Sequence, residues 1–201
     1  MLPFAAACSG GDGKKSTAEG QVESTTTTRQ PSVKVAKSYD DLAKALNIAA
    51  PDGYMLQPDQ VGDTGPSDIE KASRDDGRND AKEFLTRTRF VRGYQRMWSR
   101  SETDDFIVYL YQFADHTGAL EYTNRLAADA ATQTSGVTIG QFDVPGIGGA
   151  VGVNSSDPAF ASSSVTFVKG PYSVQVVVNG STPTGLQPLA IAVAEEQYSR
   201  L

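Results

Sequence analysis

The sequence is poor in the side chains on which nucleophilic and metal-dependent chemistry depends. Its 201 residues include one cysteine, Cys8, and one histidine, His116. A catalytic triad needs a base such as histidine beside a serine or cysteine, and a zinc site needs several histidine or cysteine ligands. A single cysteine also excludes a disulfide within the chain. We therefore expect no catalytic residues, no metal and no cofactor, with His116 as a surface residue.

Long hydrophobic runs are also absent, and positive charge is in the minority. No segment approaches the roughly 18 consecutive apolar residues of a membrane-spanning helix. The formal net charge is −6, which repels a phosphate backbone, so we expect no nucleic-acid partner. One arginine-rich stretch is predicted to be the exposed side of a strand, paired with nearby carboxylates. Its members are Arg87, Arg89, Arg92, Arg96 and Arg100.

What the chain does have near its start is a cysteine behind small residues, in Phe4-Ala5-Ala6-Ala7-Cys8. Signal peptidases need small side chains before the bond they cleave. Residues 1–8 are therefore predicted to be the remnant of a lipoprotein signal, with Cys8 as the lipidation site. The residues before Cys8 include no Lys or Arg, so either the true start lies upstream or the segment is not a working signal.

The segment that follows has the composition of a tether. Residues 9–37 are rich in Gly, Ser, Thr, Lys and Glu and contain four consecutive threonines, Thr25 to Thr28. Such a segment cannot bury enough apolar surface to offset its conformational entropy, so we predict a disordered tether. Residues 38–201 are predicted to form one globular domain. Together these features predict a protein anchored by lipid to the extracytoplasmic face of the cell membrane.

The domain itself alternates between helical and strand patterns. Ser38, Ser67 and Asp115 are predicted to cap helices, and a terminal helix is expected from Leu186 to Tyr198. Alternating or β-branched runs predict strands, the clearest of which are 90–98, 106–113, 164–168 and 172–178. The predicted fold class is α+β, an antiparallel sheet of about five or six strands covered by helices on one face.

Aromatic side chains at strand spacing are the candidates for a ligand site. Trp98, Tyr109, Tyr111 and Phe113 could line an apolar pocket, although aromatics at this spacing commonly form core. The hypothesis is therefore that some of these four rings contact a ligand.

Paired carboxylates are the common catalytic device that the composition allows. Asp75-Asp76 and Asp104-Asp105 are adjacent pairs, whose side chains diverge rather than face each other across a cleft, so we interpret them as solvated surface acids. The run 75–80 has calcium-loop residues in the wrong order. The glycines of 146–149 lack the spacing of a phosphate-binding loop and predict a turn.

Five motifs give the chain a family resemblance. They are Phe90-Val91-Arg92-Gly93-Tyr94-Gln95-Arg96-Met97-Trp98, Tyr111-Gln112-Phe113-Ala114-Asp115, Val144-Pro145-Gly146-Ile147-Gly148-Gly149-Ala150, Val165-Thr166-Phe167-Val168-Lys169-Gly170-Pro171-Tyr172 and Ala194-Glu195-Glu196-Gln197-Tyr198-Ser199-Arg200-Leu201. With these the chain resembles a group of uncharacterised actinobacterial lipoproteins over most of residues 50–201. The resemblance implies a fold and no catalytic residues. By the order of its elements the chain is also similar to extracytoplasmic kinase sensor domains and lipoproteins of PsbP-like shape, a likeness of architecture alone.

These observations favour a non-catalytic module of the cell envelope, a sensor or accessory domain. It would bind an unknown envelope ligand or partner protein and be attached to the membrane through its N-terminal lipid anchor. The alternative is a hydrolase of envelope polysaccharides that uses two carboxylates in one cleft. A third possibility is a structural interaction protein with a large exposed apolar patch.

Overall fold

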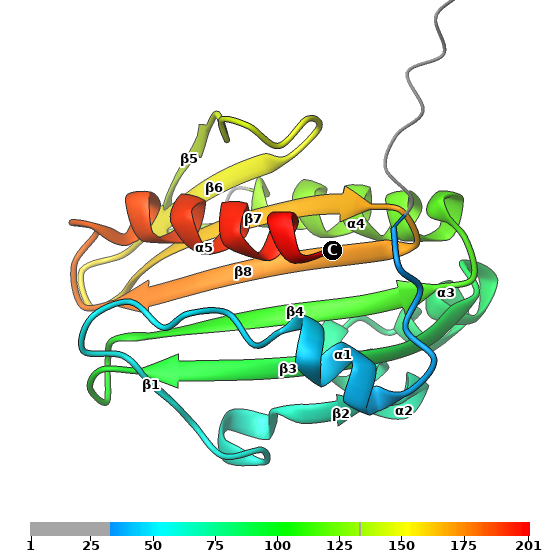
Figure 1. The fold of residues 1–201 in the computed structure, drawn as a ribbon. Helices are drawn as coiled ribbons and strands as arrows, with labels where there is room; N and C mark the ends of the chain where they lie inside the picture. The colour runs from blue at the N-terminus through cyan, green and yellow to red at the C-terminus, as the bar shows by residue number, and fades with distance from the viewer. Residues whose placement is uncertain (1–32, 133) are drawn as a thin grey trace, which may run out of the picture. The chain divides into compact units, whose positions relative to one another are not determined.

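The computed structural model describes residues 33–132 and 134–201, which form an antiparallel sheet with helices (Figure 1). The helices are α1 (Tyr39–Ala45), α2 (Ile69–Asp76), α3 (Ala81–Arg87), α4 (His116–Ala130) and α5 (Leu186–Arg200), with a short 3₁₀ turn, η1 (Val61–Asp63). The strands are β1 (Met55–Leu56), β2 (Gly65–Ser67), β3 (Phe90–Ser99), β4 (Asp105–Phe113), β5 (Thr138–Phe142), β6 (Val151–Ser156), β7 (Ala161–Lys169) and β8 (Tyr172–Gly180). Cys8 and residues 9–32 of the predicted tether lie outside these ranges.

All eight described strands belong to one sheet, in the order β1-β3-β4-β8-β7-β6-β5, with β2 also paired to β3. Every pairing is antiparallel, which confirms the α+β class. The expected number of five or six strands was too low, because β2 and β5 were missed. β2 is Gly-Pro-Ser, three residues that are uncommon in strands, and its extended form follows from pairing with Gly93–Gln95 of β3.

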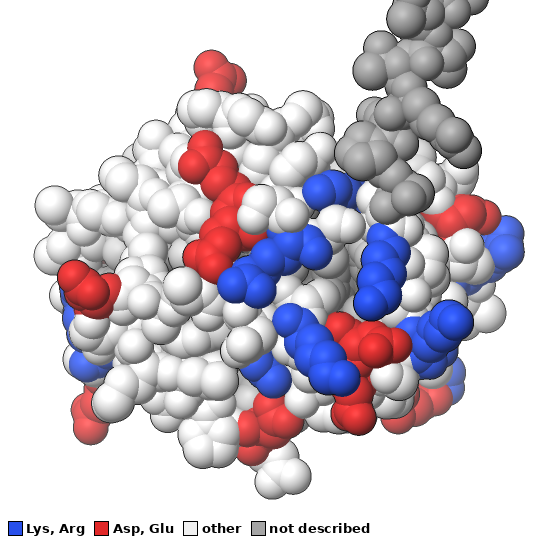
Figure 2. All heavy atoms as spheres, viewed as in Figure 1, with Lys and Arg blue, Asp and Glu red and all other residues white. Residues whose placement is uncertain are grey.

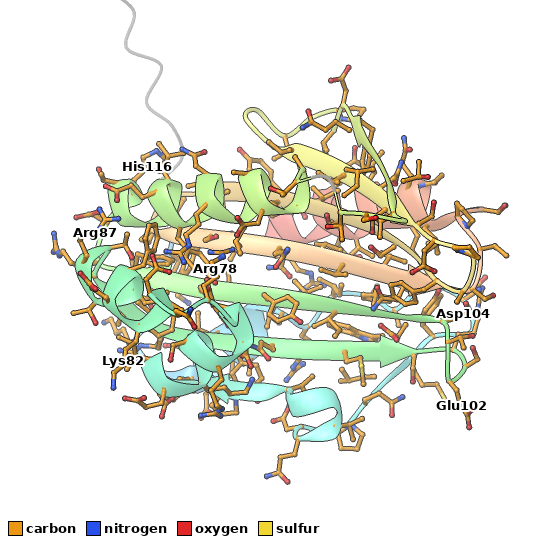
Figure 3. All side chains as sticks on the ribbon, turned by 180° about the vertical axis from the view of Figure 1, so that it is seen from behind. Arg78, Lys82, Arg87, Glu102, Asp104 and His116 are labelled. Carbon is orange, nitrogen blue, oxygen red and sulfur yellow. The ribbon has the colours of Figure 1, made fainter. Side chains whose placement is uncertain are left out.

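Helices cover both faces of the sheet, where the sequence predicted cover on one. On β4 alternate residues point to opposite sides: Phe106, Val108 and Leu110 pack with α1 and α5, and Tyr111 and Phe113 pack with α2, α3 and α4. Figure 1 shows α1 and α5 in front of the sheet, and Figure 3 shows α2, α3 and α4 on its other side. The sheet is therefore the middle layer of three.

Two of the three predicted helix caps are confirmed. The Ser38 hydroxyl accepts a hydrogen bond from the Asp41 amide, and the Asp115 carboxylate accepts one from the Gly118 amide. Ser67 was a wrong choice, because it ends β2 and the cap of α2 is the next residue, Asp68, whose Oδ1 accepts from the Lys71 amide at 2.8 Å. Local sequence therefore located the helix start to within one residue.

The described N-terminal segment, residues 33–37, is bound to the domain although we assigned it to the tether. The Ala36 amide donates to the Tyr172 hydroxyl at 2.6 Å, and that hydroxyl donates to the Lys34 carbonyl at 3.0 Å. The side-chain Nε2 of Gln112 donates to the Ala36 carbonyl at 3.1 Å. Burial raises the pKa of Tyr172, which keeps its hydroxyl protonated as a donor. These contacts hold the segment on the α1/α5 side of the sheet.

Basic side chains gather on this same side. In Figure 2, which has the view of Figure 1, lysine and arginine side chains lie around α1 and the N-terminal segment, with carboxylates among them. Lys34, Lys44 and Arg200 line one depression there, together with Asp41.

None of the helices in residues 33–132 and 134–201 is long and apolar enough to cross a membrane.

Replacing Tyr172 with Phe should loosen residues 33–37. The change removes the hydroxyl that accepts from the Ala36 amide and donates to the Lys34 carbonyl. Loss of these two hydrogen bonds lowers the free energy of unfolding by about 1–2 kcal/mol. Hydrogen exchange at the Ala36 amide should speed up about tenfold or more. Tyr39→Phe, which removes a hydroxyl from α1 on the same side, serves as the control. Equal exchange rates in Y172F and the unchanged protein would contradict the assignment of this hydroxyl as the clamp.

Candidate functional site

A cavity of about 410 Å³ lies on the α2/α3/α4 side of the sheet. Its walls come from the end of α2 with the following Arg78, the C-terminal half of α4, and strands β4 and β8. Figure 3 shows this side, with Arg78 between α4 and the α2–α3 turn. The volume falls within the range of about 300–1,000 Å³ that is common for small-molecule pockets. We refer to this space as the α2–α4 cavity.

Gly93 of β3 determines how Tyr111 lies at the base of this cavity. The two residues are directly opposite each other on β3 and β4. A Cβ atom at Gly93 would stand 2.4 Å from Cδ1 of Tyr111, closer than such atoms can approach. Because Gly93 has no side chain, the Tyr111 ring can lie across β3, where its hydroxyl meets Gln95.

Three tyrosine rings form an aromatic wall. The centroid of Tyr111 is 6.5 Å from that of Tyr109 and 5.7 Å from that of Tyr122 on α4. Burial raises the pKa of Tyr111 and of Tyr122 well above the ordinary value. Both phenols therefore stay protonated at neutral pH, and the wall presents uncharged π-faces with hydroxyl groups.

A hydrogen-bonded network links this wall to α2. Lys71 Nζ donates to Asp75 Oδ2 at 2.9 Å and to Gln95 Oε1 at 2.7 Å. Gln95 Nε2 donates to the Tyr111 oxygen at 2.9 Å and also contacts Asp75 Oδ2. The Tyr111 hydroxyl donates to the same Asp75 oxygen at 3.4 Å. Asp75 is thus a hub that orients Tyr111, and it also lines the cavity.

Arg78 connects the α2 side of the cavity to α4. Its Nη1 lies 3.1 Å from Asp76 Oδ2, and its Nη2 pairs with the Asp129 carboxylate. The Asp76 side chain is 1% exposed, whereas that of Asp129 is 51% exposed. One guanidinium therefore joins a buried carboxylate to a carboxylate at the solvent-exposed rim.

A second arginine approaches the same region from α4. Arg125 Nη1 donates to Asp80 Oδ2 at 3.0 Å, and Nη2 contacts Asp80 Oδ1. The same Nη2 lies 3.7 Å from Asp76 Oδ1. The interpretation as a solvated surface acid is therefore wrong for Asp76, whose side chain is 1% exposed and lies between Arg78 and Arg125. Asp75 stays at the surface as a residue, but its side chain is 16% exposed and bonded to Lys71 and Gln95.

Of the four predicted ligand-lining aromatics, Tyr109 and Tyr111 line the cavity. Trp98 lies on the other face of the sheet, where it stacks on Phe106 at 4.8 Å between centroids. Phe113 is on the α4 side but 1% exposed, and it packs 5.4 Å from Tyr122. The structure thus brings two of the four rings to one cavity, and contact with a ligand stays a prediction.

Sequence reasoning missed the α2 and α4 contributions to this site. We expected Ala119, Tyr122, Leu126 and Ala130 to form one buried stripe of α4. Ala119 and Tyr122 are buried, whereas Leu126 and Ala130 are partly exposed and border the cavity. The run of alanines at the end of α4 was the available indication, because small side chains there cannot fill the space above β8.

The other predicted positions lie elsewhere. His116 is exposed at the start of α4, where Nδ1 lies 3.1 Å from the Gly170 carbonyl oxygen (Figure 3). Gly146 and Gly149 have left-handed φ angles of 74° and 75° in a turn between β5 and β6. Among the residues that the structure describes, no three His, Cys, Asp or Glu side chains are grouped as metal ligands.

The prediction that the arginine-rich stretch is the exposed side of a strand is only partly right. Arg92 and Arg96 belong to β3 but are partly buried, whereas Arg87, Arg89 and Arg100 are exposed and lie outside it, Arg87 in α3. Pairing with carboxylates holds for part of the stretch. Arg87 pairs with Glu121 at 2.9 Å, Arg89 with Asp115 at 2.8 Å and Arg100 with Asp104 at 3.2 Å. Arg92 instead donates to the Lys37 carbonyl at 2.6 Å, and Arg96 lies 5.7 Å from the centre of the Tyr94 ring.

Comparison with known proteins shows a distant structural likeness. No protein-family model and no curated protein sequence matches this chain. Among solved structures, it is similar to the extracellular domain of PknH from Mycobacterium tuberculosis, at 10% sequence identity and a TM-score of 0.43. The alignment covers 81% of this chain and 92% of that chain. A likeness at this level assigns neither a family nor a function, and the resemblance to actinobacterial lipoproteins stays a prediction.

The Asp80–Arg125 pair at the edge of the site should stabilise the folded state at neutral pH and lose this contribution in acid. Hydrogen bonds from Arg125 hold the pKa of Asp80 below its ordinary value. Such a pair stabilises the folded state above the carboxyl's unfolded-state pKa and loses that contribution as pH falls through the lower folded-state pKa. The stability difference between the unchanged protein and Asp80→Asn should therefore be positive at neutral pH and shrink below about pH 4.

Urea denaturation at a series of pH values measures this difference. Glu83→Gln removes an exposed carboxylate from α3 and is the matched control, which should leave stability at neutral pH nearly unchanged. If D80N is less stable than the unchanged protein by the same amount at pH 3 and at pH 7, the ionised Asp80–Arg125 pair does not contribute to stability as predicted.

Proposed function

We propose that this chain is a small-molecule-binding module of the cell envelope, without catalytic activity of its own, that holds its ligand in the α2–α4 cavity. The observation that carries the proposal is a cavity of about 410 Å³ with an aromatic wall and a few fixed polar groups. Ligand pockets commonly combine a largely apolar lining with a small number of placed polar side chains. Lys71, Gln95 and Asp75 fix the orientation of Tyr111 before any ligand enters.

The absence of catalytic activity is proposed from the chemistry of the lining. Ser173 is the candidate nucleophile among the lining residues, and its hydroxyl oxygen accepts a hydrogen bond from the Thr123 hydroxyl at 2.7 Å rather than facing a base. His116, the single histidine, stands at the opposite end of α4 from Leu126 and Ala130 (Figure 3). A serine nucleophile without an adjacent base is weak.

The alternative, a polysaccharide hydrolase, gains carboxylates from the structure but not their required environment. Asp75, Asp76 and Asp129 all line the cavity. Glycosidases of the common kind need one carboxyl that stays protonated as a general acid beside one that is ionised. Here each of the three carboxylates contacts a cation, Lys71 or Arg78. This arrangement favours binding over hydrolysis.

We further propose that Cys8 carries a lipid that attaches the module to the extracytoplasmic face of the membrane. Support comes from the Ala-Ala-Ala-Cys sequence and from the polar composition of the residues that follow. The described domain begins at residue 33 in contact with Tyr172 and Gln112, so the chain between Cys8 and residue 33 would set the distance to the membrane.

Filling the cavity should abolish ligand binding. Ala130→Trp places an indole in the space that Ala130 and Leu126 border, whereas Ala128→Trp places one on the exposed side of the same helix and is the control. We expect one-ring aromatic fragments to give saturation-transfer NMR signals with the unchanged protein and A128W, and none with A130W. Val177→Trp, from the β8 wall, is the second variant if A130W unfolds. Equal signals from all variants would contradict the proposed site.

Acylation of Cys8 can be tested by mass spectrometry. The chain is expressed in an actinobacterial host behind a functional charged and apolar export segment that ends at Phe4. We expect the mature membrane-bound protein to begin at Cys8 with a diacylglycerol thioether, and Cys8→Ser to remain unprocessed. An unmodified Cys8 in the processed protein would contradict the anchor and leave the cavity proposal standing.

A further inference from the structure

Two polar side chains that line the α2–α4 cavity have no hydrogen bond to any residue that the structure describes. They are Gln175 on β8, whose amide carries a donor and an acceptor, and Tyr122 on α4, whose hydroxyl is a donor. Ser173 and Tyr111, by contrast, are already bonded to neighbouring side chains. A ligand that pairs with the two remaining groups therefore gains hydrogen bonds without breaking any within the protein.

Gln175 lies on the sheet side of this cavity. Like Ser173 and Val177, which alternate with it along β8, it belongs to the face that α4 covers. It stands directly opposite Tyr109 of β4 and Thr166 of β7, and it is partly exposed. Because β8 is paired on both sides, the amide extends from a rigid strand, which is a suitable base for orienting a ligand.

The charged lining residues favour an uncharged ligand, because each of them is already in an ion pair. Asp75 is paired with Lys71, and Arg78 is paired with both Asp76 and Asp129. A charged ligand would have to displace one of these pairs or enter partly buried space without a counter-charge, and both are unfavourable. Recognition in this cavity therefore falls to the neutral polar groups and the apolar surface.

The remaining lining suits a flat ring. The ring of Tyr109 is partly exposed beside Gln175, and aromatic rings pack favourably against one another. Leu126, Ala130 and Val177 supply apolar surface from α4 and β8. A sugar, which carries hydroxyl groups around its whole ring, would need more hydrogen-bond partners than two unpaired side chains supply. A planar molecule with one polar edge matches the lining better.

We propose that the α2–α4 cavity binds an uncharged planar ring that carries a carbonyl group beside an N–H group, as a lactam does. The ring N–H donates to Gln175 Oε1, and Gln175 Nε2 donates to the ring carbonyl, so that the two amide edges pair. The body of the ring packs against Tyr109 and Leu126, and the Tyr122 hydroxyl is a further donor to a ligand oxygen. This inference rests on the proposed function and adds the class of ligand.

The test compares three probes that share one ring framework: 2-quinolinone, 1-methyl-2-quinolinone and 2-quinolinecarboxylate. Isothermal titration or NMR titration of the full 201-residue chain gives their affinities. We expect 2-quinolinone to bind about tenfold more tightly than its N-methyl derivative, which has no N–H and whose methyl group keeps the two amide edges apart. The carboxylate should also bind about tenfold or more weakly than 2-quinolinone, because it is charged.

Two variants locate the preference. Gln175→Met keeps the length of the side chain and removes its donor and acceptor, so affinity for 2-quinolinone should fall about tenfold while affinity for the N-methyl derivative is retained. Gln141→Met makes the same change on the exposed strand β5, outside the cavity lining, and should alter neither affinity.

If Q175M fails to fold, the unchanged protein still tests the contact by NMR. The side-chain NH₂ signals of Gln175, assigned through its own backbone, should shift when 2-quinolinone is added. The N-methyl derivative should shift them much less at the same occupancy. Equal shifts with both probes, or none with either bound probe, would contradict pairing at Gln175.

Equal affinity for 2-quinolinone and its N-methyl derivative, tighter binding of the carboxylate, or a Q175M variant that keeps the full preference would overturn the inference. In each case, loss of all binding in A130W would leave the proposed function intact. Failure of every probe to bind, or binding that survives A130W, would count against the cavity as a ligand site of any kind. The two failures are therefore distinguishable within one set of titrations.

Discussion

Burial of the central strands on both faces is the constraint on which the rest of this domain depends. β4 and β8 sit side by side in the middle of the sheet. β4 sends side chains into two separate clusters, whereas β8 packs one face in the α1/α5 cluster and lines the α2–α4 cavity with the other. On one side, α5 and α1 cover valines and aromatics completely, as the 0% exposure of Val174, Val176 and Val178 shows. On the other side, the cover is divided between α2–α3 and α4, and the α2–α4 cavity is the space that this division leaves.

Much of the fold could be predicted because the relevant interactions are local in sequence. The pattern of 106–113 and the hairpin around Gly170 depend on neighbouring residues, and β4, β7 and β8 were all predicted. The Asp115 cap is likewise a contact across three residues. β2 depends instead on pairing with β3 some 28 residues later, where Gly65–Ser67 lies opposite Gly93–Gln95, and nothing in Gly-Pro-Ser indicates this pairing. The second helical layer was missed because which face of the sheet a helix covers also depends on contacts between segments that are distant in sequence.

The candidate site was predictable only where it shares the periodicity of a strand. Tyr109 and Tyr111 alternate with core residues on β4, so their selection followed from spacing. Asp75 and Asp76 were interpreted as surface acids because a short helix with consecutive carboxylates is usually solvated. The Asp76 carboxylate is covered by Arg78 and by Arg125, which lies about 50 positions downstream on α4, and the Asp75 carboxylate is bonded to Tyr111. Charge complementarity between distant segments leaves no trace in local pattern.

The clamp at Tyr172 and the α2–α4 cavity belong to opposite sides of the sheet. Residues 33–37 are held on the α1/α5 side, which carries the gathered lysines and arginines, and none of them lines the cavity. Displacement of this segment from Tyr172 would therefore leave the walls of the cavity complete.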